Sequence, residues 1–137
     1  MVVADSSVLI EYLNGNTTPQ VIWMQQAGHA QRIAITSLIF CEVLRGVRNH
    51  RDLARVRSAL SGFHIFENVD TELAIAAAQN FRHLRSLGIT VRGTMDCLNA
   101  TFCLRQGHIL LHNNRDFDAF EQHLDLRVVH PAEPQRP

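Results

Sequence analysis

Short apolar runs alternate along the chain with longer segments in which apolar residues recur every three or four positions. The runs predict five buried, mostly parallel β-strands: Val2–Ala4, Ile33–Ile35, His64–Phe66, Ile109–Leu111 and Arg127–Val129. The longer segments predict seven helices: Ser6–Leu13, one that begins at Thr18 and Pro19, Ser37–Val47, Asp52–Leu60, Thr71–Leu87, Met95–Gln106 and Asp116–His123. This alternation predicts a doubly wound α/β fold, a three-layer α/β/α sandwich with a short, mostly parallel central sheet.

The 137 residues are enough for one domain, which we place at residues 1–130, followed by a flexible, proline-rich tail at 131–137. No apolar stretch approaches the ~20 residues that span a bilayer, and the N-terminus lacks the basic segment of a signal peptide. Three cysteines, Cys41, Cys97 and Cys103, lie in apolar stretches and are interpreted as reduced core residues. We therefore expect a cytoplasmic protein without a membrane partner.

The basic residues are unusual in kind, since all 13 are arginine and the chain has no lysine. This excludes Schiff-base enzymes, Walker-A phosphate binding and receiver-type phosphoacceptor domains, each of which requires a lysine. The net charge of zero indicates no particular partner. The planar guanidinium group of arginine binds phosphate oxygens with two parallel hydrogen bonds and suits phosphate better than lysine does. Biased genomic composition explains the exclusive use of arginine equally well.

Four acidic residues fall at or near the carboxyl ends of predicted strands, where doubly wound sheets bind their ligands. Asp5 directly follows the first strand, and Asp116 follows the fourth after a short loop. Glu42 and Asp96 lie in the first two turns of two later helices. Taken singly, each has a structural explanation: Asp5 and Asp116 as helix caps, Asp96 as a partner of the helix dipole, and Glu42 as a partner of Arg45.

As a set, the four acids need a different explanation. Glu42 and Asp96 stand in apolar segments, where acids are seldom left unpaired. Two like charges ~4 Å apart repel by about 4 kcal/mol at an effective dielectric constant of 20, and a divalent cation removes that repulsion. Oxygen-only ligands favour Mg²⁺ or Mn²⁺ over Zn²⁺. Such an ion suits phosphodiester cleavage, because it activates water and neutralises charge on the phosphate.

The sequence resembles PIN-domain ribonucleases, and in particular the VapC-type toxins of bacterial toxin–antitoxin pairs. The resemblance covers nearly the whole chain and rests on three stretches in order: "VVADSSVLIEYL", "ITSLIFCEVLRG" and "VRGTMDCLNATFCLRQGHILLHNNRDFDAF". It implies that Asp5, Glu42, Asp96 and Asp116 bind the metal and are the catalytic residues.

The resemblance also assigns two supporting residues. Ser7 falls where a hydroxyl supports the acidic cluster, and Asn114 falls where an acid or amide completes it. The chain departs from the family pattern at three positions. Ser6 replaces the commoner threonine, Asn99 takes a place that is usually aliphatic, and Asn114 in place of aspartate removes one possible ligand charge.

The function that the resemblance implies is Mg²⁺- or Mn²⁺-dependent endonucleolytic cleavage of RNA by a metal-activated water, leaving a 5′-phosphate and a 3′-hydroxyl. It also implies a homodimer and a small VapB-like antitoxin whose C-terminal segment wraps the toxin and enters the acidic groove.

RNA binding next to an acidic centre requires a positive rim. Arg45, Arg48, Arg92 and Arg115 lie close to the acids in sequence and are candidates for phosphate contacts, although solvated helix-face arginines explain each of them equally well. Among the eight histidines, His112 is the one that leaves the fourth predicted strand toward the site. The others are interpreted mainly as structural or solvent-facing residues.

Two further interpretations remain open at this point. A catalytically silent PIN-like module that binds RNA or protein would share the fold and differ only in chemistry. A metal-dependent phosphatase or receiver domain on a similar sheet is disfavoured, because Asp5 is followed by Ser6 and Ser7 with no aspartate two positions on, and because the lysine is missing.

Overall fold

Four short parallel strands form the centre of the protein, whose computed structural model describes residues 1–27 and 32–132. The strands are β1 (Val2–Ala4), β2 (Ile33–Thr36), β3 (His64–Phe66) and β4 (Ile109–Leu111), and their order across the sheet is β3-β2-β1-β4. Val3 lies opposite Ala34 on one side and Leu110 on the other. This register aligns the carboxyl ends of the strands at one edge of the sheet.

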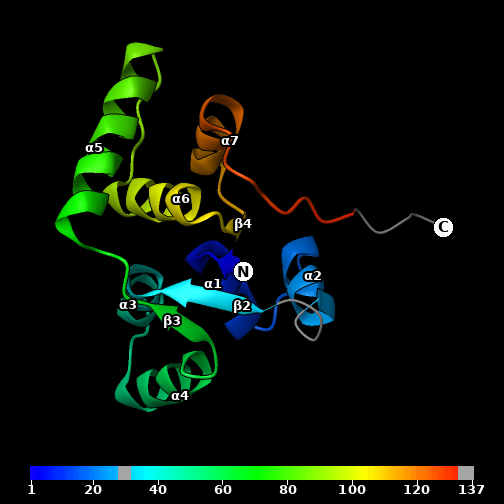
Figure 1. Ribbon diagram of the computed structural model, residues 1–137. Helices are drawn as coiled ribbons and strands as arrows, with labels where there is room; N and C mark the ends of the chain where they lie inside the picture. Colours follow the sequence, from blue (N-terminus) through cyan, green and yellow to red (C-terminus); the bar gives the residue numbers. More distant parts are fainter. Residues whose placement is uncertain (28–31, 133–137) are drawn as a thin grey trace.

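Helices cover both sides of the sheet. They are α1 (Ser6–Leu13), α2 (Pro19–Ala27), α3 (Ser37–Arg45), α4 (His50–Leu60), α5 (Thr71–Ser86), α6 (Thr94–Gln106) and α7 (Asp118–Leu124), with a 3₁₀ turn, η1, at Arg115–Phe117. Figure 1 shows α5, α6 and α7 on one side of the sheet and α4 on the opposite side. The predicted α/β/α sandwich is confirmed, and its sheet is entirely parallel in the described residues.

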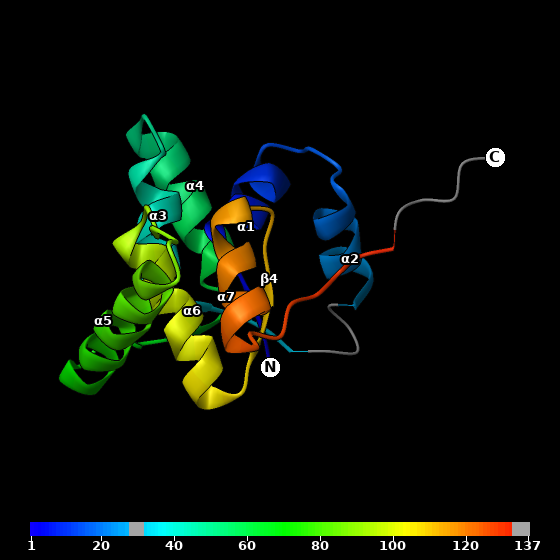
Figure 2. The ribbon, with the colours of Figure 1, turned by 90° about the horizontal axis from the view of Figure 1, so that it is seen from above.

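The direction in which the chain adds strands to the sheet changes at β1, so that β4 lies on the other side of β1 from β2. The chain adds β2 and β3 on one side of β1, then crosses back through α5 and α6 to add β4 on the other side. Helices α5 and α6, which form this crossing, pack against each other (Figure 2). In doubly wound sheets, the point of reversal leaves a crevice outside the carboxyl ends of the strands, and ligands bind there.

Two predicted elements at the C-terminal end were wrong in their details. The predicted strand Arg127–Val129 is present only as an isolated bridge between Val128 and Leu110, because its contact with β4 is too short to form a ladder. The last α-helix begins at Asp118 rather than Asp116, because the chain first forms the 3₁₀ turn. Of the predicted tail, residues 133–137 lie outside the described residues.

The core lies between the sheet and its covering helices. It contains strand residues such as Val3 and Leu110 and helix residues such as Leu9, Leu84 and Phe120, all with no exposed side-chain surface. Two cysteines belong to it as expected, since Cys97 and Cys103 are buried free thiols. The expectation that Cys41 is a core residue was wrong. Cys41 is exposed, because it lies on the outer face of α3.

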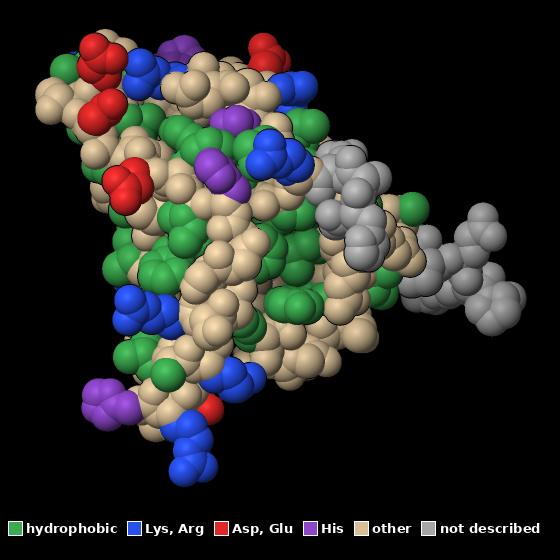
Figure 3. Space-filling model, turned by 60° about the horizontal axis from the view of Figure 1, so that its bottom comes forward, with side chains coloured by type: hydrophobic (Ala, Val, Ile, Leu, Met, Phe, Trp, Pro, Cys, Tyr) green, Lys and Arg blue, Asp and Glu red, His purple; other side chains and the backbone are tan. Residues whose placement is uncertain are grey.

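The surface mixes charged and apolar side chains. Figure 3 shows one face of the molecule, on which arginine side chains are dispersed among hydrophobic and polar ones. Among the described residues, none of the helices combines the length and the apolar character needed to cross a membrane.

Candidate metal centre

Asp5 stands at the carboxyl end of β1, and the turn into α1 fixes its position. Its backbone N–H donates to the carbonyl oxygen of Leu111 on β4 at 2.9 Å. Its Oδ2 accepts hydrogen bonds from the backbone N–H and the hydroxyl of Ser7, at 3.0 and 2.7 Å, so Asp5 is indeed the N-cap of α1. Its Oδ1 is buried and has no hydrogen-bond partner. One oxygen of the carboxylate therefore caps the helix, and the other remains available to a ligand.

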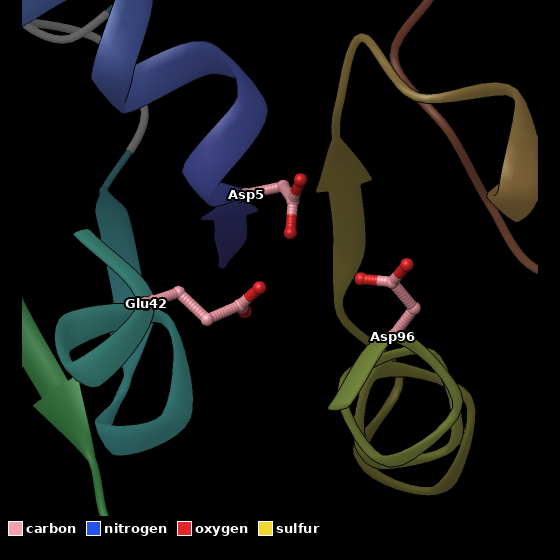
Figure 4. A group of neighbouring side chains, drawn as sticks. All are labelled: Asp5, Glu42 and Asp96. Atoms are coloured by element: carbon pink, nitrogen blue, oxygen red, sulfur yellow. The ribbon is translucent and has the colours of Figure 1, made fainter. Parts of the chain in front are cut away.

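Two further carboxylates meet Asp5 from distant parts of the chain. Glu42 extends from the second turn of α3, and Asp96 lies in the first turn of α6. Each of the three residues offers one carboxylate oxygen, and these three atoms lie within 4.8 Å of one another. Figure 4 shows the three side chains pointing into one space between α1, α3 and α6. We call this group the acidic triad.

Burial and mutual repulsion hold the triad in a state that resists ionisation. Burial, with smaller contributions from the charges of Asp5 and Asp96, raises the pKa of Glu42 to about 7. Burial and the charges of Asp5 and Asp116 raise the pKa of Asp96 to about 6. The pKa of Asp5 is also raised by burial, against the opposing effect of the Ser7 hydrogen bonds. A bound cation would reverse this situation by favouring the ionised forms.

The donor atoms of the triad fit a hard divalent cation. All are carboxylate oxygens, which is the ligand type that Mg²⁺ and Mn²⁺ prefer. Asp5 Oδ1 and Glu42 Oε1 are both buried without a hydrogen-bond partner, although buried polar atoms normally have one. A cation in the space that they share would satisfy both.

Asp116 and Asn114 lie beside the triad and are not part of it. Asp116 is close enough for its charge to raise the pKa of Asp96, but its carboxylate is not in the group of atoms within 4.8 Å. The Asn114 side chain donates through Nδ2 to Asp96 Oδ2 at 3.4 Å, and its Oδ1 accepts from the backbone N–H of Asp116 at 3.0 Å. Asn114 therefore orients Asp96 and caps the 3₁₀ turn, and its oxygen is already engaged.

The loop after β4 is held against the site by Ser7 and His112. The hydroxyl of Ser7, which donates to Asp5, also accepts from the backbone N–H of Asn113 at 3.0 Å. His112 Nδ1 accepts from the backbone N–H of Asn114 at 3.1 Å. Burial lowers the pKa of His112, while the charge of Asp5 opposes that effect, so the neutral ring serves as an acceptor. The sequence placed His112 near the site without indicating this contact.

The four candidate RNA-binding arginines are all exposed, but they stand in different relations to the triad. The charge of Arg45, three residues after Glu42, lowers the pKa of that glutamate, so it acts on the triad directly. Arg48 lines a cavity of about 330 Å³ between α1 and α4. Arg92 precedes α6, and Arg115 begins the 3₁₀ turn.

Two further features of the Asp96 helix have no counterpart among the predicted site residues. Gly93 is the residue before α6, and a Cβ atom there would lie 3.0 Å from Asp96 Oδ2. Asn99, one turn after Asp96, is fully buried and accepts a hydrogen bond from Thr36 at 2.7 Å. The sequence signals were a glycine directly before a helix and an amide in an otherwise apolar stretch of that helix.

A doubly wound sheet with three carboxylates converging at its reversal point defines an α/β protein with an acidic centre whose oxygens could hold a divalent cation. The chain belongs to the PIN domain family, whose profile matches residues 2–122. It is 29% identical over 134 residues to Ribonuclease VapC11 of Mycobacterium tuberculosis and to VapC ribonuclease Mb1587 of Mycobacterium bovis. Each alignment covers 94% of this chain and 98% of the relative.

Solved structures with the same fold include two toxin–antitoxin complexes. VapBC2 from Rickettsia felis, bound to a DNA fragment from its promoter, has a TM-score of 0.77 at 16% identity and aligns 94% of this chain with 98% of that chain. DNA-bound VapBC from Salmonella typhimurium has a TM-score of 0.74 at 22% identity and aligns 93% of this chain with 96% of that chain. At these identities, the similarity establishes the fold.

Proposed function

We propose that this protein is an endoribonuclease that depends on Mg²⁺ or Mn²⁺ and acts as the toxin of a toxin–antitoxin pair. The acidic triad carries the proposal, because two of its buried oxygens have no hydrogen-bond partner among the residues that the structure describes. Membership of the PIN domain family and the similarity to proteins named VapC ribonucleases over 94% of the chain support it.

Asp5, Glu42 and Asp96 would hold the ion, and Asp116 would add negative charge beside them. The ion would lower the pKa of a bound water and thereby activate it for attack, and it would neutralise charge on the phosphate. Ser7 fixes the orientation of Asp5 with two hydrogen bonds. The three carboxylates of the triad must be ionised for this role, which their raised pKa values oppose in the metal-free protein and a cation favours.

The substrate and partners follow from the same site. Arg45, Arg92 and Arg115 are exposed and close in sequence to the acids, and they would bind the phosphates that flank the cleaved bond, while Arg48 would contact RNA farther along. A VapB-like antitoxin would block the site by placing a basic segment on the triad, since a guanidinium group pairs well with carboxylates. The protein would act in the cytoplasm as a homodimer.

The direct test is cleavage of RNA by the purified protein with Mg²⁺ or Mn²⁺, with and without EDTA. We expect products with 5′-phosphate ends, and we expect Asp5→Asn and Asp96→Asn to abolish cleavage. Asp125→Asn is the matched control, because Asp125 is exposed and has a left-handed backbone (φ 60°) that asparagine also adopts readily. Cleavage that survives EDTA, or that is equal in all three variants, would contradict the proposal.

The alternative of a catalytically silent module makes a different prediction for the same preparation. It predicts that the protein binds RNA or a protein partner but yields no new RNA ends with either metal. Toxin function is tested in cells, where expression of the chain alone should arrest growth and co-expression of the small protein encoded beside it should restore growth.

A further inference from the structure

We infer that Thr36 and Asn99 form a positioning pair that sets the separation of Glu42 and Asp96, and thereby the metal affinity of the triad. The inference rests on the proposed function. It concerns neither a metal ligand nor a group that contacts RNA, but a buried hydrogen bond beneath the site.

The bond joins the two helices that carry these acids. Thr36 is the last residue of β2 and the N-cap of α3, and its Oγ1 accepts from the backbone N–H of Ile39 at 3.1 Å. The same hydroxyl donates to Oδ1 of Asn99 on α6 at 2.7 Å. Neither side chain has any exposed surface. One hydroxyl therefore fixes the start of α3 and ties it to α6.

Both acids lie close to this bond along their helices. Glu42 is six residues after Thr36 in a helix of nine residues, and Asp96 is three residues before Asn99, on the adjacent turn of α6. A carboxylate oxygen of Glu42 and one of Asp96 lie within 4.8 Å of each other, so the ionised forms of the two side chains repel. The buried hydrogen bond opposes the separation of α3 and α6 that this repulsion favours.

The Asn99 side chain is not optimal for the stability of the core. Asn99 Nδ2 is buried without a hydrogen-bond partner, and a buried unpaired donor is destabilising. A leucine has the same side-chain branching but is larger, and it would exchange the unpaired Asn99 Nδ2 for a Thr36 hydroxyl without its acceptor. The chain keeps an amide whose oxygen meets Thr36 although the amide nitrogen has no hydrogen-bond partner among the described residues. This favours a role in the geometry of the site over a role in stability.

The two roles predict opposite results for Asn99→Leu. If Asn99 only contributed to folding through its hydrogen bond, the metal-free protein would lose thermal stability and the folded fraction would bind metal normally. If Asn99 positions Asp96, Mg²⁺ binding by the folded protein should weaken about tenfold whatever the change in melting temperature, since groups that orient metal ligands typically contribute 10–100-fold to affinity.

The experiment measures Mg²⁺ and Mn²⁺ binding to the full-length protein by titration calorimetry, and thermal unfolding in EDTA. Asn80→Leu is the matched control: Asn80 on α5 also donates to a threonine of α6, Thr101, at 3.1 Å, but this bond does not involve α3. Thr36→Val should weaken metal binding, and Thr36→Ser, which retains the hydroxyl, should restore it. The threonine variants provide the test if Asn99→Leu does not fold.

Metal binding by Asn99→Leu that equals that of the wild type, or that falls no more than in Asn80→Leu, would overturn the inference. Equal affinities of Thr36→Val and Thr36→Ser would do the same. A wild-type protein that binds neither metal would instead refute the proposed function and the positioning role together, so the two failures are distinguishable.

Discussion

The acidic triad should lower the stability of the metal-free protein, and Glu42→Gln should relieve that effect. Glutamine has nearly the shape of glutamate, but it carries no charge at any pH. We therefore expect Glu42→Gln to be more stable than the wild type in EDTA at pH 8, although it removes a residue that we assign to catalysis.

The size of the effect follows from the pKa of Glu42, which burial and neighbouring charges raise from 4.5 to about 7. Because the folded state binds this proton more tightly than the unfolded state, the associated stability is fully present below pH 4.5 and is lost as the pH rises through 7. Each pKa unit corresponds to about 1.4 kcal/mol, and screening at a half-buried group reduces the total. We expect a gain of about 1–2 kcal/mol at pH 8, and a much smaller one at pH 5.

The assay is urea unfolding of both proteins at pH 5 and pH 8 in EDTA, and again in saturating Mg²⁺. With Mg²⁺ the order should reverse, because an ion at 100 times its dissociation constant stabilises the wild type by about 2.7 kcal/mol, and the variant should bind it weakly. Glu67→Gln, at an exposed position, should match the wild type throughout. An equal gain at both pH values, or no reversal with Mg²⁺, would refute the reasoning.

Three other substitutions test separate parts of the structure. Gly93→Ala would place a methyl group 3.0 Å from Asp96 Oδ2 and should weaken Mg²⁺ binding about tenfold in calorimetry, while the circular dichroism spectrum stays that of the wild type. Arg45→Ala should reduce the slope of log K for single-stranded RNA against log salt by about 0.7, and Arg85→Ala should not; equal slopes would remove Arg45 from the RNA interface. Phe120→Ala should reduce the free energy of unfolding by about 3–5 kcal/mol in urea, because this ring is fully buried.

Most helices and strands could be predicted because their apolar residues, as spaced in the sequence, are the residues that face the core of the folded protein. The strands Val2–Ala4, His64–Phe66 and Ile109–Leu111 have the bounds that the apolar runs indicated. The predicted strand Arg127–Val129 has a similar composition, but only Val128 pairs with β4. Pairing at an edge depends on how far a neighbouring strand extends, and a local pattern does not contain that information.

The site could be predicted in part for the same reason. Asp5, Glu42 and Asp96 follow directly from their places after strands or early in helices, because a parallel sheet brings such positions to one edge. The hydrogen bond from Thr36 to Asn99 spans 63 residues and depends on how α3 and α6 pack, so the sequence showed only an unusual amide. The contact between His112 and the backbone of Asn114 depends likewise on the path of a loop.

The place of β1 in the sheet bears on when the acidic triad can be completed during synthesis of the chain. The first strand to leave the ribosome lies between β2 and β4, and the backbone of Asp5 is held by Leu111 of β4. A nascent chain that lacks β4 has most of its helices but not the contact that fixes Asp5. If the chain has the function proposed above, translation would have to pass residue 111 before the protein could cleave RNA.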